Sequence, residues 1–221
     1  IDHLVLAGGG HTHALVLLRW AMNSKLKPAG MITLVNQSST TIYSGMFPGV
    51  VAGKYKIDEI IIDLRNLASK ARISFVMAEI QYINIKKKKL ILRGRPEIEY
   101  SSLSLNVGTK TNLSSEHLIR TEEKIAVPIK PFSKSIEFII DQDIYKDDLS
   151  AKPFLIIGSG FAGMEIAFAL RNRWPQRSIQ LKLKSGKKLP SNLLKTIKAL
   201  NIEIIKKETS SLYPKLICTG N

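Results

Sequence analysis

The residues whose types and spacing could do chemistry are three glycines. Gly158, Gly160 and Gly163 follow the apolar run Phe154–Ile157 and open a segment with helical apolar spacing. In a strand–turn–helix context, the first glycine makes a tight turn, the second lets the backbone approach a pyrophosphate, and the third lets the helix pack close to the strand. The N–H groups at a helix N-terminus bind phosphate. The stretch predicts a dinucleotide site, and a glycine turn without a ligand is the alternative.

A second glycine turn stands near the start of the chain. The segment His3–Trp20 predicts a strand, the turn Gly8–Gly10 and then a helix. His13 occupies the position of the third glycine. Either the helix therefore lies slightly further from the strand, or the His13 side chain points away from the contact between helix and strand. His11 and His13 either reach a phosphate or a flavin edge, or they cap an exposed helix start. The residues leave these two interpretations open.

The ends of the two following strands bear on the ribose of a dinucleotide. The strand Met31–Val35 is followed by Asn36, where the fingerprint expects an acidic residue for the ribose hydroxyls. An amide can bind a hydroxyl without charge assistance. The strand Ser178–Leu183 is followed by Lys184, which suits the phosphate of NADPH better than the bare ribose of NADH. Surface charge is the other interpretation of this lysine.

The elements that must position these residues alternate between strands and helices. We expect a glycine-rich loop over Thr41–Lys54, a partial helix over Asp58–Ala71, and a hairpin over Ile80–Leu92. Further expected elements are the strands Ile73–Ile80, Tyr100–Asn106, Ile202–Lys206 and Leu216–Cys218, and the helices Ser133–Asp143 and Ser191–Leu200. The pattern predicts an α/β fold of two Rossmann-like units with parallel sheets: a first over residues 1–112, a linker over 113–150 and a second over 151–221.

Composition limits the function classes. The 221 residues are 44% hydrophobic, which is ordinary for a globular protein, and no apolar run approaches the roughly 18–20 residues of a membrane span. The one cysteine, Cys218, excludes an intrachain disulfide and fits a reducing cytoplasm. The net charge of +15 raises the alternative of an RNA-binding domain. However, Lys86–Lys89 is the only basic block and has no interleaved aromatic residues, so we interpret it as a solvated hairpin tip.

Two glycine turns in this order resemble the two-dinucleotide-fold flavoproteins of the pyridine nucleotide-disulfide oxidoreductase superfamily. More narrowly, the stretches AGGGHTHALVL, TIYSGMFPGVVAGKY, IDLRNLA and SLNVGT resemble the type II NADH dehydrogenase-like domain that some bacteria fuse ahead of selenophosphate synthetase (selenide, water dikinase). The resemblance covers nearly the whole chain. It implies FAD in the first unit and NAD(P)H in the second.

The resemblance also implies roles for single residues. Those it places at the FAD are Gly8, Gly10, His11, Asn36, Ser44, Gly45, Met46, Ile80, Val107, Gly108 and Thr109. Those it places at the nicotinamide cofactor are Gly158, Gly160, Gly163 and Glu165. Lys130 either lies near the flavin ring and stabilises its reduced anion, or is a solvated linker lysine.

The chain departs from the family in two places. Thr209–Lys215 is almost all that remains of an antiparallel insertion in the second unit, and the sequence ends at Asn221, before the family's Gly-Asp segment. The C-terminal part of the FAD domain is therefore expected to be absent from this sequence: either these are residues of a longer chain, or the FAD site is incomplete. We also expect no membrane span, although peripheral association with a membrane is compatible with the sequence.

The expected function is that of a flavin-dependent NAD(P)H dehydrogenase, which passes hydride from NAD(P)H to flavin and then electrons to a small-molecule acceptor such as a quinone. Ser44 and Met46 stand where relatives with an active disulfide carry a Cys-x4-Cys pair, which excludes thiol–disulfide reduction. The first alternative is a non-catalytic dinucleotide-binding or regulatory module attached to a partner domain. The RNA-binding domain is the second.

Overall fold

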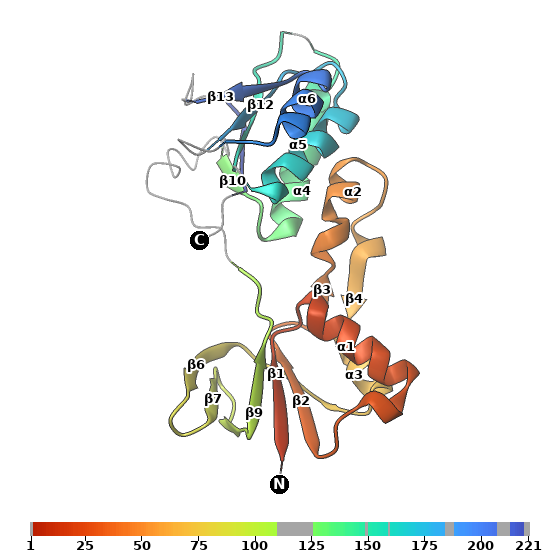
Figure 1. Ribbon diagram of the computed structural model, residues 1–221, viewed down its shortest axis with the longest axis vertical. Helices are drawn as coiled ribbons and strands as arrows, with labels where there is room; N and C mark the ends of the chain where they lie inside the picture. Colours follow the sequence, from red (N-terminus) through yellow and green to blue (C-terminus); the bar gives the residue numbers. More distant parts are fainter. Residues whose placement is uncertain are drawn as a thin grey trace. The chain divides into compact units, whose positions relative to one another are not determined.

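The computed structural model describes residues 2–109, 126–148, 150–158, 160–183, 188–206 and 213–218. By its internal contacts the chain divides into two compact units. The first comprises Ile1–Ser44 and Ile60–Gly108, and the second comprises Gly45–Glu59 and Thr109–Asn221. Figure 1 labels the elements of both.

The first unit is built on a four-stranded parallel sheet. Its strands, in spatial order, are β5 (Ser74–Met77), β2 (Met31–Asn36), β1 (His3–Ala7) and β9 (Ser102–Leu105). Ala7, the last residue of β1, pairs with both Val35 and Leu105, so three strands end at the same edge of the sheet. In open parallel sheets this carboxyl edge is where ligands bind.

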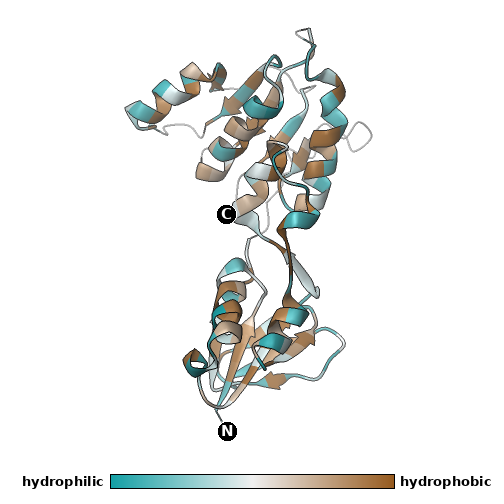
Figure 2. Ribbon diagram, turned by 90° about the vertical axis from the view of Figure 1, so that its right-hand side faces the viewer, coloured by the Kyte–Doolittle hydropathy of each residue, from teal (hydrophilic) through white to brown (hydrophobic). Residues whose placement is uncertain are grey.

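Helices cover one face of this sheet and a second sheet covers the other. Leu6 packs among residues of α1 (His11–Met22) and α3 (Leu64–Lys70), whereas Val5 packs against the antiparallel sheet β6–β7–β8. Neighbouring side chains of a strand point to opposite faces, and β1 is apolar on both because both are covered. Figure 2 shows the strands above the N-terminus mostly in the hydrophobic colour.

The remaining elements of the first unit are short. They are η1 (Ser24–Leu26), β3 (Thr40–Ile42), η3 (Asp58–Ile60, of which only Ile60 belongs to this unit), β4 (Ile61–Asp63), β6 (Ile80–Asn84), β7 (Lys89–Leu92) and β8 (Ile98–Glu99). The expected partial helix over Asp58–Ala71 is therefore η3, a strand and α3. Asp63 ends that strand and caps α3, because its Oδ1 accepts from the Asn66 N–H at 2.9 Å. The hairpin with the lysines at its turn is confirmed as β6–β7.

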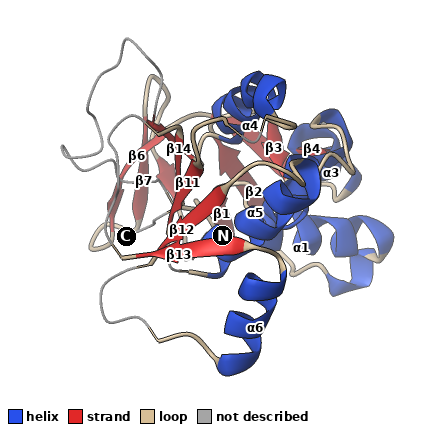
Figure 3. Cartoon of the chain, turned by 90° about the horizontal axis from the view of Figure 1, so that it is seen from above, coloured by secondary structure: helices blue, strands red, loops and turns tan. Residues whose placement is uncertain are grey.

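The second unit contains a five-stranded parallel sheet (Figure 3). Its strands, in spatial order, are β10 (Ala126–Pro128), β14 (Lys215–Ile217), β11 (Phe154–Ile157), β12 (Ile179–Lys182) and β13 (Ile202–Ile205). Its helical elements are η2 (Ser44–Met46, which begins in the first unit), α2 (Phe47–Val51), α4 (Phe132–Asp141), η5 (Gln142–Tyr145), α5 (Phe161–Arg173) and α6 (Ser191–Ala199). Both units are thus α/β with parallel sheets.

Two expectations about the chain's organisation need correction. Residues 126–148 do not form a linker, because β10 pairs with β14 inside the second sheet and α4 packs on β10. The glycine-rich segment Thr41–Lys54 is not a plain loop either. It contains α2, which begins with Pro48 in its first turn, where the missing N–H of proline costs no hydrogen bond.

The segment Gly45–Glu59 belongs to the second unit through contacts with α4 and α5. The Phe47 ring lies 4.2 Å from that of Phe132, measured between ring centroids. At the end of α5, Asn172 donates to the Ala52 carbonyl at 3.3 Å and Arg173 donates to the Val51 carbonyl at 3.4 Å. The carbonyls at the C-terminus of α2, which have no partner within the helix, are thereby bound.

Candidate functional site: two glycine turns

The first turn joins β1 to α1 and is held tightly. The Gly8 N–H donates to the Val35 carbonyl at 2.8 Å, and Gly8 has a φ of +90°, which favours glycine. A Cβ on Gly8 would lie 2.5 Å from the carbonyl oxygen of Asn106, just beyond β9. The backbones at the ends of β1 and β9 therefore meet at this point.

His13 does not point away from the helix–strand contact, and it does not cap an exposed helix start. Its side chain is buried, with 3% exposed, and Nδ1 lies 2.6 Å from the Gly8 carbonyl oxygen. The carbonyl can only accept, so Nδ1 carries the proton and Nε2 accepts from the Ser104 hydroxyl at 2.9 Å. Burial lowers the pKa of His13, and the weaker opposing effect of the Gly8 hydrogen bond does not restore it. His13 therefore fills, as a neutral ring, the space that a third glycine would leave.

The N–H groups of this turn are occupied by the protein's own acceptors. The Gly9 N–H donates to Asn36 Oδ1 at 2.8 Å, and the Gly10 N–H donates to the Asn106 carbonyl at 3.0 Å. The Asn106 side-chain oxygen accepts from the N–H groups of Thr12 and His13, at 3.1 and 3.4 Å. Asn36 lies at the end of β2, as the ribose prediction requires. However, its carboxamide oxygen accepts from the Gly9 N–H and so stabilises the turn.

Sequence reasoning did not single out Asn106. Asparagine is among the residue types that satisfy helix N-terminal N–H groups, so its type was a usable signal. However, a capping residue normally lies next to its helix in the sequence, and Asn106 lies 94 residues from Thr12. Only the parallel pairing of β9 with β1 brings the two together.

The second turn joins β11 to α5. Among the described residues, no side chain hydrogen-bonds to the N-terminus of α5, and no atom lies within 4 Å of a Cβ placed on Gly160. A Cβ on Gly163, in contrast, would lie 2.4 Å from the Gly158 carbonyl oxygen. The close helix–strand approach expected of Gly163 is therefore confirmed. Ser159, within the turn, and the predicted phosphate ligand Lys184 lie outside the described residues.

The structure brings two further predicted residues together in the second unit. The Lys130 ammonium donates to the Thr109 hydroxyl at 3.4 Å and lies 5.7 Å from the centroid of the Phe132 ring. Lys130 is half-buried and follows β10. Its contact with Thr109 is exposed, so both interpretations of Lys130, near a flavin ring or solvated, stay open.

The other predicted residues are spread over both units. Ser44 and Gly45 are exposed and Met46 is half-buried in η2; Ile80 begins β6; Val107, Gly108 and Thr109 follow β9; and Glu165 is exposed on α5. Val107 is 65% exposed, so its side chain is available to a ligand in the first unit. The ligand contacts assigned to all these residues stay predictions.

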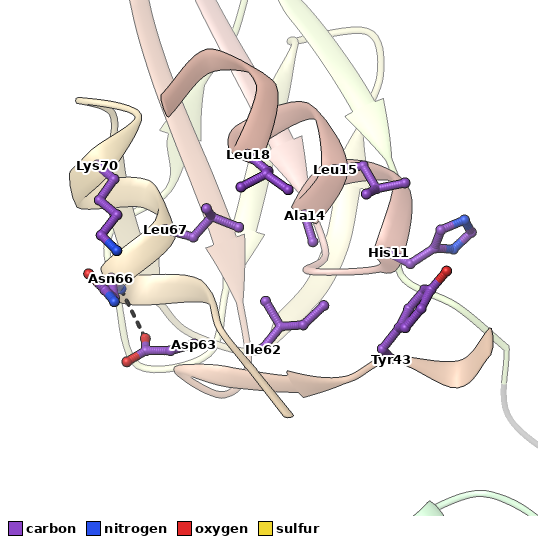
Figure 4. A pocket seen from close by; sticks show the side chains of 10 residues that line it. All are labelled: His11, Ala14, Leu15, Leu18, Tyr43, Ile62, Asp63, Asn66, Leu67 and Lys70. Carbon is purple, nitrogen blue, oxygen red and sulfur yellow. Dashed lines mark hydrogen bonds between the residues drawn. The ribbon is translucent and has the colours of Figure 1, made fainter. Parts of the chain in front are cut away.

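An apolar trough lies beside the first turn, between α1 and α3 (Figure 4). It has a volume of about 350 Å³. Its lining residues are His11, Ala14, Leu15, Leu18, Tyr43, Ile62, Asp63, Asn66, Leu67 and Lys70. His11 and Tyr43 stand together at one end, with ring centroids 6.0 Å apart, and Lys70 stands at the other. Exposed aliphatic side chains make this trough a place for an apolar group.

Comparisons with known proteins bear on the fold. No protein-family model matches the sequence, and no curated protein matches it. Solved structures do match: the sulfide:quinone oxidoreductase of the hyperthermophilic bacterium Aquifex aeolicus has a TM-score of 0.73 at 16% identity. The match covers 100% of this chain and 59% of that protein. The chain therefore has a Rossmann-like α/β fold with parallel sheets.

Two more solved structures share this fold. NDH2 from Plasmodium falciparum, solved in complex with NADH, has a TM-score of 0.70 at 14% identity, covering 100% of this chain and 55% of that one. The NADH:rubredoxin oxidoreductase of Clostridium acetobutylicum has a TM-score of 0.67 at 18% identity, covering 99% and 58%. The chain therefore spans less than two thirds of the length of each of these three proteins.

The described residues limit other kinds of site. No helix among them is long and apolar enough to cross a bilayer. Nor do they bring together three or more histidine, cysteine, aspartate or glutamate side chains in a group that could hold a metal ion.

Proposed function

We propose that the chain is the dinucleotide-binding part of an FAD-dependent NAD(P)H dehydrogenase-like oxidoreductase, which passes hydride from NAD(P)H to flavin and then electrons to an acceptor such as a quinone. The observation that carries this proposal is the pairing of two glycine turns, each at the carboxyl edge of a parallel sheet, in a chain with a Rossmann-like fold. The named neighbours, which include an NADH:rubredoxin oxidoreductase and a sulfide:quinone oxidoreductase, support it.

In this proposal the bound cofactors supply the redox chemistry, and the protein binds and orients them. The N-terminus of α5 holds the nicotinamide dinucleotide, because no described side chain caps its first N–H groups and no described atom lies within 4 Å of a Cβ placed on Gly160. Glu165 on α5 and Lys184 contribute to the same site. The first turn and the residues after β9 hold the FAD, and Lys130 supplies positive charge near the flavin ring.

Cys218 takes no part in the proposed reaction. It is the chain's single cysteine, its N–H donates to the Ile157 carbonyl at 2.7 Å, and a Cβ on Gly158 would lie 2.9 Å from its Cβ. Burial raises the pKa of its thiol to about 12, so the reactive thiolate is scarce at neutral pH. The proposed oxidoreductase therefore works without a redox-active disulfide.

The second candidate is a non-catalytic dinucleotide-binding module attached to a partner domain, and selenophosphate synthetase is the partner that the sequence resemblance suggests. The structural feature that favours it is the capped first turn, in which Asn106 and Asn36 occupy N–H groups that a phosphate would use. A module of this kind binds a nicotinamide dinucleotide at α5 and no flavin. Nucleic acid is not a partner in either proposal, and cytoplasmic location is part of both.

A visible absorption spectrum of the purified protein, recorded without oxygen before and after NADH or NADPH is added, separates the two candidates. A bound flavin that bleaches with one nucleotide supports the dehydrogenase and identifies the donor. A protein that takes up no added FAD, yet binds NADH or NADPH in a way that Gly160→Ala weakens, supports the module. Binding of neither cofactor contradicts both candidates.

A further inference from the structure

Asn106 contacts the first turn through both its backbone and its side chain. Its backbone is fixed, because its N–H donates to the Ala7 carbonyl at 2.8 Å and its carbonyl accepts from the Gly10 N–H at 3.0 Å. Its side-chain oxygen accepts from the Thr12 N–H at 3.1 Å. The N–H groups in the first turn of a helix have no acceptor within the helix, and they are the groups that bind a phosphate oxygen. A carboxamide oxygen thus stands where a phosphate oxygen would bind.

The two glycine turns of the chain differ at this point. In the first turn, a Cβ on Gly10 would lie 2.2 Å from Asn106 Oδ1, so the asparagine side chain fills the space above the second glycine. In the second turn, no atom of the described residues lies within 4 Å of a Cβ placed on the corresponding Gly160. The N-terminus of α1 is therefore closed by a side chain, whereas none of the described side chains closes that of α5.

We infer that Asn106 determines the affinity of the first turn for the phosphates of a dinucleotide by competing with them for the N–H groups of Thr12 and His13. This inference rests on the proposed dinucleotide binding by the first unit. Only the side chain has to move, because the backbone of Asn106 is held by Ala7 and Gly10. A phosphate carries a full negative charge and binds N–H groups more strongly than a neutral carboxamide, so a ligand can displace the side chain at a cost in affinity.

The test uses the whole chain with inorganic pyrophosphate as the probe, followed by ¹H–¹⁵N spectra of the Thr12 and His13 amides. Asn106→Ala removes the competing oxygen, and Asn106→Ser retains a polar side chain that is too short to reach both amides. Asn106→Asp keeps the cap and adds a negative charge that repels phosphate. Asn23→Ala is the matched control, because Asn23 caps η1 in the same unit by accepting from the Lys25 N–H at 3.1 Å.

We expect pyrophosphate to shift the Thr12 and His13 amide signals of Asn106→Ala and Asn106→Ser at concentrations about tenfold lower than in the wild type, the effect of one competing hydrogen bond. Asn106→Asp should show no such shifts, and Asn23→Ala should behave as the wild type. The inference is overturned if folded Asn106→Ala and Asn106→Ser bind pyrophosphate no better than the wild type.

A parallel titration with FAD separates this inference from the proposed function. FAD should follow pyrophosphate, with tighter binding by Asn106→Ala than by the wild type. If pyrophosphate behaves as expected while no variant binds FAD, the dehydrogenase proposal fails and the inference about Asn106 holds. If the wild type binds FAD and Asn106→Ala binds it equally or less tightly, Asn106 is a structural cap and the inference fails.

Discussion

The Nδ1 atom of His13 lies 2.6 Å from the carbonyl oxygen of Gly8. His13 makes this contact from the position that the third glycine holds in the dinucleotide fingerprint. In the second unit, Gly163 occupies the corresponding place, and a Cβ there would lie 2.4 Å from the carbonyl oxygen of Gly158. In the first turn, the Gly8 carbonyl thus accepts from the imidazole N–H of His13. In the second turn, Gly163 has no side chain, which lets the helix approach the strand closely. The two turns have the same fold but different sensitivities to pH and to substitution.

The stability of the first unit should depend on the charge of His13. Burial lowers the pKa of this histidine below 6.5, so protons bind preferentially to the unfolded chain between the folded and unfolded pKa values. The contribution of His13 is therefore complete above pH 6.5 and is lost as the pH falls toward its folded pKa. Urea unfolding at pH 7.5 and 5.5 measures this loss, which His13→Gln should reduce. His11→Gln, at an exposed position of the same helix, is the control, and an equal pH dependence in both variants would contradict the assignment.

Gly163→Ala should mainly lower stability, whereas Gly160→Ala should mainly weaken dinucleotide binding. Alanine at 163 places a Cβ against the backbone of Gly158, so we expect a loss of about 1–3 kcal/mol in the free energy of unfolding. Alanine at 160 meets no atom of the described residues within 4 Å and should cost at most about 1 kcal/mol, as a poorer N-cap than glycine, while its Cβ blocks a dinucleotide. Thermal unfolding and titration with NADH and NADPH distinguish the two. Equal stabilities, or unchanged nucleotide binding by Gly160→Ala, would count against this account of the turn.

Asp143 should be important for the second unit. Its carboxylate accepts from Arg173 at 2.7 and 2.5 Å and from the indole N–H of Trp174 at 2.7 Å. Burial alone would raise the pKa of Asp143, but the hydrogen bonds from Arg173 and Trp174 outweigh it and lower the pKa. The stabilising contribution is therefore present above about pH 4 and lost as the pH falls further.

Asp143→Ala should cost about 2 kcal/mol in the free energy of unfolding, because three N–H donors of Arg173 and Trp174 lose their acceptor. Asp147→Ala removes an exposed carboxylate from the same segment and should be nearly neutral. Chemical denaturation at pH 7 measures both. Similar losses in the two variants would show that the network around Asp143 adds nothing.

The Cys218 thiol should react slowly with alkylating reagents in the folded protein. Its pKa of about 12 leaves little thiolate at pH 7, and the end of β14 is packed against the second glycine turn. Iodoacetamide labelling followed by mass spectrometry should show rapid modification only in denaturant. Rapid labelling under native conditions, in a sample that circular dichroism shows to be folded, would contradict this burial.

The patterns with local causes could be predicted from the sequence. The apolar runs before Gly8 and Gly158 predicted β1 and β11, and the helices after them followed from apolar spacing. The same reasoning expected a loop where α2 lies, because a five-residue helix has too few turns to show periodicity. It also missed β10, whose three residues form a strand only because β14 lies beside them.

The glycines of the candidate site could be predicted from the sequence, whereas the polar residues that contact the first turn could not. Gly158, Gly160 and Gly163 stand at a turn because their spacing reflects local backbone geometry. The places of His13 and Asn106 depend on which strand lies beside β1, and this neighbour is separated from it by about 100 residues. No local pattern carries that information.

The position of α2 has a consequence for how the protein is made. Residues 45–59 leave the ribosome early, but their partners Phe132, Asn172 and Arg173 are synthesised 85 to 122 residues later. During that interval the Phe47 ring has no surface to cover it, and such transiently exposed apolar surface is where chaperones bind and aggregation begins. A fragment that starts after Gly108 would lack α2 altogether. The second unit, with α2, therefore cannot be obtained as one continuous fragment by cutting the chain at one point.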